Sequence, residues 1–333
     1  MLSRQFLTDM CRLSTMAYRE NSFISDLFDN LNGNRPHSNE FCVLEKCHTC
    51  PSLIQGDLSQ ETDIIQNDAQ AYACRYDESL AIVFRGTESF RDVLTDLNMI
   101  RVRMDLPGHT GDTRPKVHWG FLRQFRTIEE QVREHIEFYI KDCDEFKSED
   151  AEAEVEVNSD SEAGEEDPIV QQPENKVVET SVKDIKNINN GIPNGPPIKH
   201  VVFSGHSLGG ALATLAAVQF AKQYPDITVT CVTFGSPRVG NGSFAEMFNK
   251  CCKGSYRFVN EDDPVPMGPT PLRFTHVKGG KWIDDDQLLL QKPWMRSLTF
   301  FKNLFLSFIG LTHNPVSDHG CLSYLTFISG MQE

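Results

Sequence analysis

The stretch Lys199–Ala217 constrains the fold of this chain more than any other segment. It reads KHVVFSGHSLGGALATLAA, in which a β-branched and aromatic run leads into Ser207 and an Ala- and Leu-rich run follows it. This pattern predicts a strand, a sharp turn and a helix. Gly205 and Gly209 flank the serine as G-x-S-x-G, and glycine allows strand and helix to approach closely enough to hold a serine in a strained turn. We therefore interpret Ser207 as a candidate nucleophile raised out of a sheet.

The residue after the serine is expected to take part in the same chemistry. The first N–H groups of a helix have no partner within the helix, and they lie at the positive end of its dipole. The backbone N–H of Leu208 is therefore the expected donor to an oxyanion. A serine hydroxyl is a poor nucleophile by itself, so the chain must also supply a histidine as base and a carboxylate to orient it.

Candidates for the acid and the base follow the serine, because chains with this turn carry nucleophile, acid and histidine in that order. The acidic residues at a predicted strand end are Glu261, Asp262 and Asp263. Of the ten histidines, those after the acid are His276, His313 and His319. The order alone leaves the choice within each group open.

Five sequence blocks along the chain match the pattern of one known family. The blocks are GHSLGGALA, FRGTES (Phe84–Ser89), VHWGF (Val117–Phe121), FVNEDDPVP (Phe258–Pro266) and DHGCLSYL (Asp318–Leu325). Together, and in this order, they resemble the class 3 lipases, the fungal-type triacylglycerol lipase family. The resemblance implies an α/β-hydrolase fold, with a mainly parallel central sheet flanked by helices.

The resemblance also selects among the candidate residues. It implies that Asp263, which directly precedes Pro264-Val265-Pro266, is the acid, with Asp262 as the alternative. It implies that His319 in the terminal DH motif is the base, with His313 as the alternative.

Two further roles near the start of the chain follow from the same resemblance. Thr87, after the strand that ends in FRG, stands where the family carries the second oxyanion donor. Residues Phe90–Asp96 stand where the family has a short helical lid. Phe90, Val93 and Leu94 would cover the site in water and turn outward on lipid, or they would belong to a fixed helix.

The function that the resemblance implies is hydrolysis of acyl-glycerol esters of the triacylglycerol type by a Ser207–His319–Asp263 triad through an acyl-enzyme. No metal or organic cofactor is expected, and Cys47-x-x-Cys50 lacks the second half of a zinc site. The expected partners are a lipid ester and, transiently, a membrane or lipid-droplet surface. The alternatives are a phospholipase A1 or diacylglycerol lipase, and an inactive lipase-like scaffold that binds a partner through an acidic arm.

The acidity of the chain is concentrated in one segment. The formal net charge is −15 at pH 7, but Asp142–Thr180 holds fifteen acidic residues against two lysines, which leaves about −2 for the rest. Nothing resembles a basic stripe for nucleic acid. Residues 148–197 are too polar to offset the entropy of ordering. We expect one lipase domain over residues 1–333, with a disordered acidic insertion at 148–197.

The N-terminal residues predict a cytoplasmic location. MLSRQFLTDMCRLSTMAYRE lacks the uninterrupted apolar run of a secretory signal and carries charges at Arg4, Asp9 and Arg12. No transmembrane span is seen, and the ten cysteines are expected to be free thiols of a reducing compartment. A secreted mature form with disulfides is the alternative.

Hydrophobic periodicity places the remaining elements. Strands are expected at Ala69–Arg75, Leu80–Phe84, Val229–Phe234 and Tyr256–Val259, the first two as a hairpin. Helices are expected within residues 1–20 and at Phe121–Cys143, Leu208–Tyr224 and Ser243–Cys252. The stretch from Asn32 to Gln60 is interpreted as loop, with a short hairpin as an addition to it. Ser297–Leu311 is expected to be a helix that is either buried or lies on a lipid surface.

Overall fold

A computed structural model of the chain describes ten ranges of residues. They are 3–18, 52–55, 70–76, 78–86, 100–107, 115–140, 197–260, 263–284, 287–289 and 319–330. The predicted insertion at 148–197 lies outside these ranges except for its last residue. So do Cys47, Cys50 and the helix predicted at Ser297–Leu311.

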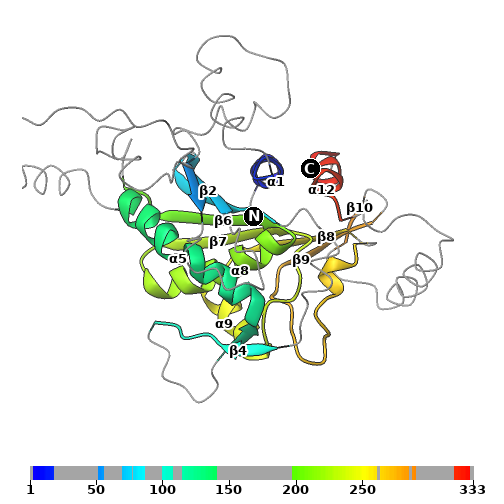
Figure 1. The fold of residues 1–333 in the computed structure, drawn as a ribbon. Coiled ribbons are helices and arrows are strands. Elements are labelled where there is room, and N and C mark those ends of the chain that lie inside the picture. The colour runs from blue at the N-terminus through cyan, green and yellow to red at the C-terminus, as the bar shows by residue number, and fades with distance from the viewer. Residues whose placement is uncertain are drawn as a thin grey trace, which may run out of the picture.

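One sheet of eight strands crosses the whole structure (Figure 1). Its order is β1-β2-β3-β6-β7-β8-β9-β10. The strands are β1 (Ser52–Gln55), β2 (Gln70–Tyr76), β3 (Ser79–Phe84), β6 (His200–His206), β7 (Thr228–Phe234), β8 (Tyr256–Asn260), β9 (Gly280–Asp284) and β10 (Gln287–Leu289). From β3 through β9 neighbouring strands are parallel, and the pairs β1–β2, β2–β3 and β9–β10 are antiparallel. The predicted mainly parallel sheet is therefore present.

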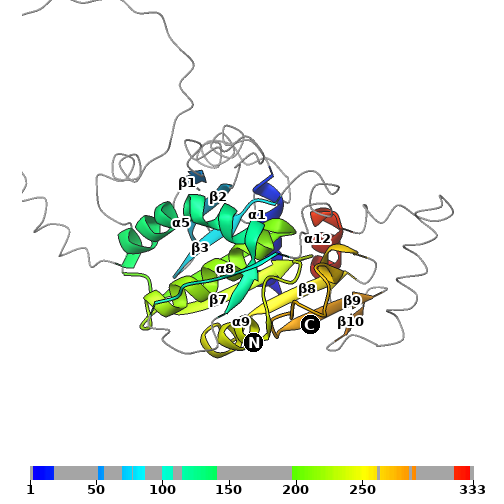
Figure 2. The same cartoon turned by 60° about the horizontal axis from the view of Figure 1, so that its bottom comes forward.

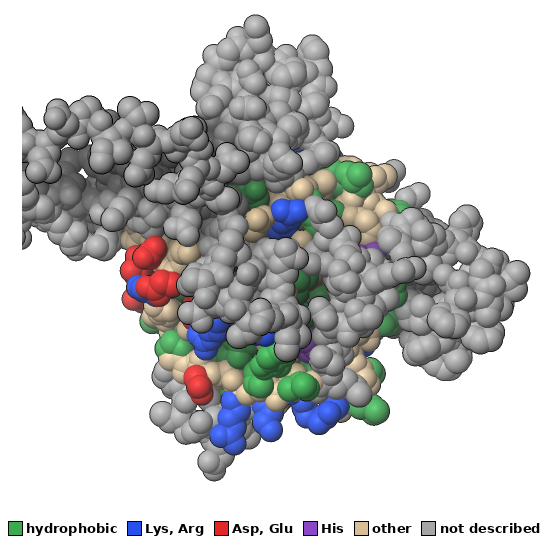
Figure 3. Space-filling model, in the orientation of Figure 1, with side chains coloured by type: hydrophobic (Ala, Val, Ile, Leu, Met, Phe, Trp, Pro, Cys, Tyr) green, Lys and Arg blue, Asp and Glu red, His purple; other side chains and the backbone are tan. Residues whose placement is uncertain are grey.

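Helices cover both faces of this sheet. On one face lie α5 (Trp119–Ile140), α8 (Leu208–Gln223) and α9 (Gly242–Cys251), and on the other lie α1 (Arg4–Met16) and α12 (Cys321–Gly330) (Figures 1 and 2). A separate two-stranded ribbon pairs β4 (Arg101–Arg103) with β5 (Lys116–His118), and a short 3-10 helix, η2, spans Val265–Met267. On the face drawn in Figure 3, hydrophobic and basic side chains lie next to each other on its lower part.

Side-chain alternation along the strands divides the core into two layers. Leu80, Ile82 and Phe84 of β3 pack toward α5 and α8, whereas Ala81 and Val83 pack toward α1 and α12. Successive strand side chains point to opposite faces, so a strand covered on both faces is apolar throughout. All six residues of β3 are buried, which explains why the sequence shows a continuous apolar run there.

A buried carboxylate fastens α1 to the sheet. Asp9 is fully buried, and its Oδ2 accepts the hydroxyl of Tyr76 on β2 at 2.6 Å. Its Oδ1 accepts the side-chain amide of Gln5 at 2.8 Å, and the guanidinium of Arg12 lies 3.3 Å from the same oxygen. Because a buried charge is costly unless it is hydrogen-bonded, the Tyr76 hydroxyl, which is the one donor of the three outside α1, holds α1 against β2.

Most elements predicted from periodicity are present within about three residues of their expected bounds. The predicted hairpin is β2–β3, and the four predicted helices are α1, α5, α8 and α9. The strands predicted at Val229–Phe234 and Tyr256–Val259 are β7 and β8. In the stretch interpreted as loop with a short hairpin, Ser52–Gln55 forms the edge strand β1, which pairs with β2. Strands β4, β5, β9 and β10 were not predicted; they have three to five residues each, too few to establish a period.

We predict that Tyr76→Phe lowers the free energy of unfolding by about 1–3 kcal/mol, because it removes a hydrogen bond to a buried carboxylate and leaves that oxygen short of a donor. Urea denaturation measures the change. Tyr256→Phe is the matched control, since the half-buried Tyr256 ring packs on Phe258 and its hydroxyl makes no hydrogen bond within the described residues. Equal stability of the two variants would contradict the anchoring role of Asp9.

Candidate active site

Ser207 occupies the sharp turn between β6 and α8. Its backbone has φ 58° and ψ −126°, and it is the one non-glycine residue with positive φ among the described residues. A positive φ is costly for a residue with a Cβ, so the surrounding structure must hold it there. The predicted strand, turn and helix are therefore present, with the serine at the turn.

Two glycines allow this turn to form. A Cβ at Gly209 would lie 2.2 Å from the carbonyl oxygen of Phe84 and 2.9 Å from the carbonyl carbon of Arg85. A Cβ at Gly205 would lie 2.4 Å from the carbonyl carbon of Gly209. These contacts are with backbone, which cannot rotate away as a side chain would. The close approach of β3, β6 and α8 therefore requires glycine at both positions.

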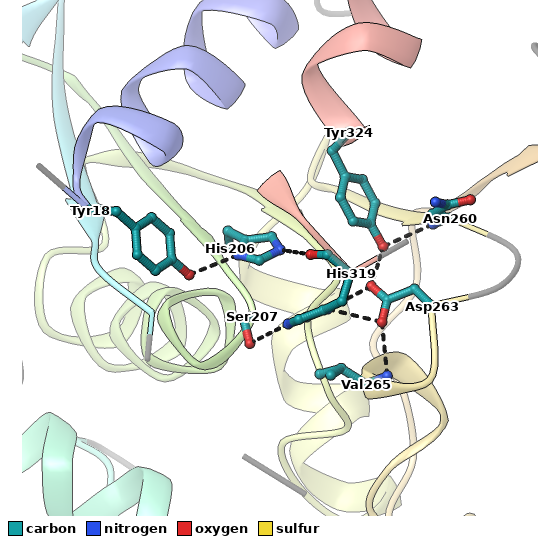
Figure 4. A network of polar contacts seen from close by, with 8 residues as sticks. All are labelled: Tyr18, His206, Ser207, Asn260, Asp263, Val265, His319 and Tyr324. Atoms are coloured by element: carbon teal, nitrogen blue, oxygen red, sulfur yellow. Dashed lines mark hydrogen bonds and ion pairs between the residues drawn. The ribbon is translucent and has the colours of Figure 1, made fainter. Parts of the chain in front are cut away.

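The histidine predicted as the base reaches the serine. His319 lies just before α12, and its Nε2 is 2.7 Å from Ser207 Oγ (Figure 4). Its Nδ1 lies 2.9 Å from each carboxylate oxygen of Asp263. Because a carboxylate can only accept, Nδ1 carries the proton and Nε2 remains as the acceptor for the serine hydroxyl. The arrangement can accept a proton from Ser207.

Asp263 follows β8 and is completely buried. Its Oδ1 accepts the backbone N–H of Val265 at 2.9 Å, and its Oδ2 accepts the hydroxyl of Tyr324 at 2.5 Å (Figure 4). Tyr324 Oη in turn accepts the backbone N–H of Asn260 at 2.9 Å. Burial, and then the charge of Asp263, raises the pKa of Tyr324 well above its usual value, so the hydroxyl stays a donor. The carboxylate of Asp263 is therefore held by Val265 and Tyr324 as well as by His319.

His206 lies next to Ser207 in the sequence, but its ring contacts other residues. Its Nε2 lies 2.6 Å from the backbone carbonyl oxygen of His319, and its Nδ1 lies 2.8 Å from Tyr18 Oη (Figure 4). Burial, with a contribution from neighbouring His319, lowers the pKa of His206 well below its usual value. The ring is therefore neutral. Tyr18 has no part in the sequence-based site; only the alternation of β6, which turns His206 toward α1, could have indicated a partner there.

The predicted oxyanion donors are described in part. Leu208 opens α8, and its backbone N–H has no acceptor among the described residues, as expected in the first turn of a helix. Thr87 lies outside the described residues, and so do the lid residues Phe90, Val93 and Leu94.

The alternative acid Asp262 and the alternative base His313 also lie outside the described ranges. His276, the third histidine in the order argument, is described; its Nε2 lies 2.7 Å from the carbonyl oxygen of Pro266. His118 stacks on Phe121 with 4.2 Å between ring centroids. Neither ring has a hydrogen bond to Ser207 among the contacts of the described residues.

Within the described ranges, no three His, Cys, Asp or Glu side chains gather in a way that could bind a metal ion. Across the same ranges, no helix is both long and apolar enough to cross a membrane. Six cysteines are described, and all are free thiols: Cys11, Cys74, Cys231, Cys251, Cys252 and Cys321.

Comparison with known proteins confirms the resemblance to the class 3 lipases. Residues 169–272 match the family model described as Lipase (class 3). A secreted mono- and diacylglycerol lipase of Fusarium solani is 40% identical over 94 residues, which are 28% of this chain and 27% of that protein. A lipase of Rhizopus niveus is 26% identical over 248 residues, 71% of this chain and 47% of that protein. The chain thus spans between about a quarter and a half of the length of these relatives.

The solved structures confirm the α/β-hydrolase fold. A Rhizomucor miehei lipase in complex with its propeptide superimposes with a TM-score of 0.51 at 22% identity, and the match covers 86% of this chain and 71% of that one.

The prediction of a cytoplasmic location is wrong. It was based on the lack of a signal-like apolar run near residue 1, but several relatives are secreted lipases. The prediction that all ten cysteines are free thiols assumed the same reducing compartment, so that argument no longer supports it. The six described cysteines are nevertheless free.

We predict that Gly209→Ala lowers the free energy of unfolding by about 2 kcal/mol or more. Helix propensity alone favours alanine by about 1 kcal/mol, but the new Cβ would collide with the backbone of β3. Urea denaturation decides which effect is larger. Gly330→Ala at the end of α12 is the control, because nothing lies within 4 Å of a Cβ there. A Gly209→Ala variant more stable than the parent would refute the close-approach argument.

Proposed function

We propose that this chain, which resembles the class 3 lipases over residues 169–272, is a serine hydrolase that cleaves acyl-glycerol esters. The observation that carries the proposal is the continuous path from Ser207 Oγ through the His319 ring to Asp263, with contacts of 2.7 and 2.9 Å. The serine has a base within hydrogen-bond reach, and the base has a buried carboxylate that fixes its tautomer.

In the acylation step, Ser207 Oγ attacks the ester carbonyl carbon while its proton moves to His319 Nε2. The imidazolium that forms is stabilised by Asp263, which keeps its negative charge. When the tetrahedral intermediate collapses, the bond to the leaving alcohol breaks and His319 returns the proton to that oxygen. The products are a free alcohol, such as a glyceride with one acyl chain fewer, and an acyl-Ser207 ester.

Deacylation repeats these steps with water as the nucleophile. His319 Nε2 takes a proton from water, the hydroxide oxygen attacks the acyl carbonyl, and the proton then moves to Ser207 Oγ. In both halves the carbonyl oxygen becomes negative. We propose that the N–H of Leu208 and the backbone N–H and hydroxyl of Thr87 stabilise that charge; one such donor is worth about 3–4 kcal/mol.

The proposed substrates are lipid esters with a glycerol backbone. Support comes from the relatives, which include a mono- and diacylglycerol lipase and a lipase. The number of acyl chains that the site accepts is the finer question, because one relative is named for mono- and diacylglycerol and the other only as a lipase.

We further propose transient contact with a lipid surface. Exposed large apolar side chains include Leu272, which is 93% exposed, and Leu322, which is 66% exposed. The first follows Asp263 by nine residues and the second follows His319 by three, so both lie close in sequence to the proposed triad. The lid predicted at Phe90, Val93 and Leu94 would add apolar surface when open.

We predict that Ser207→Ala lowers turnover of a soluble p-nitrophenyl ester by at least about 10⁴-fold, because the change removes the nucleophile. Ser204→Ala is the matched control. Ser204 is buried on the same strand and donates to the carbonyl oxygen of Val232 at 2.9 Å, so its loss should affect stability and leave turnover near that of the parent. Wild-type turnover by Ser207→Ala would end the proposal.

The acid and base assignments are tested in pairs. Asp263→Asn should lose most activity, because an amide would favour the wrong tautomer of His319, whereas Asp262→Asn should lose little. His319→Ala should behave like the serine variant, and His313→Ala should remain active. The reverse result in either pair would move the assignment to the alternative residue.

A panel of substrates tests the lipid class. Equal concentrations of mono-, di- and triacylglycerol and of phosphatidylcholine, presented in the same detergent and followed by mass spectrometry of the products, should yield fatty acid from at least one acylglycerol. Release from phosphatidylcholine alone would contradict the acyl-glycerol proposal and leave the serine mechanism in place.

A further inference from the structure

The proposed base is held at its backbone as well as at its ring. The carbonyl oxygen of His319 lies 2.6 Å from His206 Nε2, and His206 Nδ1 lies 2.8 Å from the hydroxyl of Tyr18. Figure 4 shows the three residues in a row from the end of α1 to the start of α12. This row is separate from the path through Asp263, because the row ends at the His319 backbone whereas Asp263 contacts the His319 ring at Nδ1.

The proton positions in this row follow from its ends. A carbonyl oxygen can only accept, so His206 Nε2 carries a proton and donates it. In a neutral ring the other nitrogen then accepts, so Tyr18 donates its hydroxyl to Nδ1. Burial favours that neutral ring by lowering the pKa of His206. Each contact therefore has one donor and one acceptor.

Tyr18 lies where several elements of the site meet. A Cβ at Gly86 would lie 2.2 Å from the Tyr18 hydroxyl oxygen and 2.6 Å from the carbonyl oxygen of His206. Gly86 directly precedes Thr87, the proposed oxyanion donor. The hydroxyl thus lies beside the start of the segment that follows β3 as well as beside the end of β6.

Other contacts join α1 to the start of α12. Thr15 Oγ1 lies 3.2 Å from Cys321 Sγ, and the thiol of Cys11 lies 4.0 Å from the Cys321 carbonyl oxygen. Cys321 follows His319 by two residues. The helix at one end of the described chain therefore contacts the turn that carries the proposed base at more than one point.

We propose that Tyr18 and His206 are positioning residues that set the distance between His319 Nε2 and Ser207 Oγ by fixing the His319 backbone. This inference rests on the proposed function, because it assigns a role toward the same reaction. Asp263 sets the orientation of the His319 ring, whereas the Tyr18–His206 row fixes the position of the backbone from which that ring extends. Proton transfer over 2.7 Å is sensitive to such placement, since a displacement of about 1 Å can cost about 100-fold in rate.

The neutral state of His206 serves the same purpose. The His206 and His319 rings lie with centroids 4.6 Å apart. His319 becomes an imidazolium during each proton transfer, and a second positive ring at that distance would oppose its formation. Because His206 donates its hydrogen bond as a neutral ring, it avoids that repulsion.

The first test is Tyr18→Phe, which removes one hydroxyl and keeps the ring. We expect kcat per titrated active site for a soluble p-nitrophenyl ester to fall about 10-fold, with KM unchanged, because the base is displaced while substrate binding is untouched. Active sites are counted by the burst of p-nitrophenol. Tyr256→Phe is the matched control and should keep the parent kcat. Counting sites matters because a merely structural role would reduce the fraction of active protein and leave kcat per site intact.

The second test compares two changes at His206. His206→Gln keeps an N–H donor that can reach the His319 carbonyl oxygen, whereas His206→Ala keeps none. We expect His206→Gln to retain at least about 5-fold more kcat per site than His206→Ala, with equal KM values. Equal kcat per site in both variants would overturn the inference, as would an unchanged kcat in Tyr18→Phe.

These outcomes are distinguishable from failure of the proposed function. If the parent protein does not turn over the ester, or if Ser207→Ala does, the proposed function is wrong. If the parent and Ser207→Ala behave as proposed while Tyr18→Phe and His206→Ala keep the parent kcat per site, the positioning inference alone is wrong.

Discussion

The close approach of β6 and α8 at the Ser207 turn is the constraint on which the rest of the site depends. Glycine at 205 and 209 lets the two backbones approach each other closely. The turn then holds Ser207 at φ 58° and places its hydroxyl at the carboxyl end of β6. The same turn leaves the N–H of Leu208 at the open end of a helix. The proposed nucleophile and the proposed oxyanion donor therefore arise from one backbone geometry. The parallel sheet brings the proposed acid to the same end of the strands, because Asp263 follows β8 at its carboxyl end.

The base reaches this edge from a different layer. His319 precedes α12, which packs with α1 on the face opposite α8. Its ring is fixed by Asp263 and its backbone by His206, and each of these has a further tyrosine behind it, Tyr324 and Tyr18. Burial raises the pKa of Tyr324 and lowers the pKa of His206, so both side chains stay neutral. In the proposed mechanism the moving proton is therefore exchanged between Ser207 and His319.

Local sequence predicted a large part of this structure. The elbow carries its own pattern of glycines, and β3 and α8 are marked by apolar runs that fit a buried strand and a buried helix. Ser207, the strands around it and the flanking helices could therefore be predicted. Tyr18 could not, because its partner His206 lies 188 residues away and the contact exists only after α1 packs on β6. The short strand β9 depends on pairing with β8 for its shape, and β10 depends on pairing with β9. Location in the cell was misjudged because a missing apolar run near one end is weak support for any compartment.

Covalent labelling of the nucleophile tests the central claim most directly. A fluorophosphonate reacts with an activated serine and leaves a stable phosphonyl group on its oxygen. Incubation of the folded protein with such a reagent, followed by proteolysis and mass spectrometry, should place one phosphonyl group per chain on the peptide that contains Ser207, and His319→Ala should slow the reaction by at least about 100-fold. Labelling at another residue, or equal labelling rates in the parent and His319→Ala, would contradict a serine activated by this histidine.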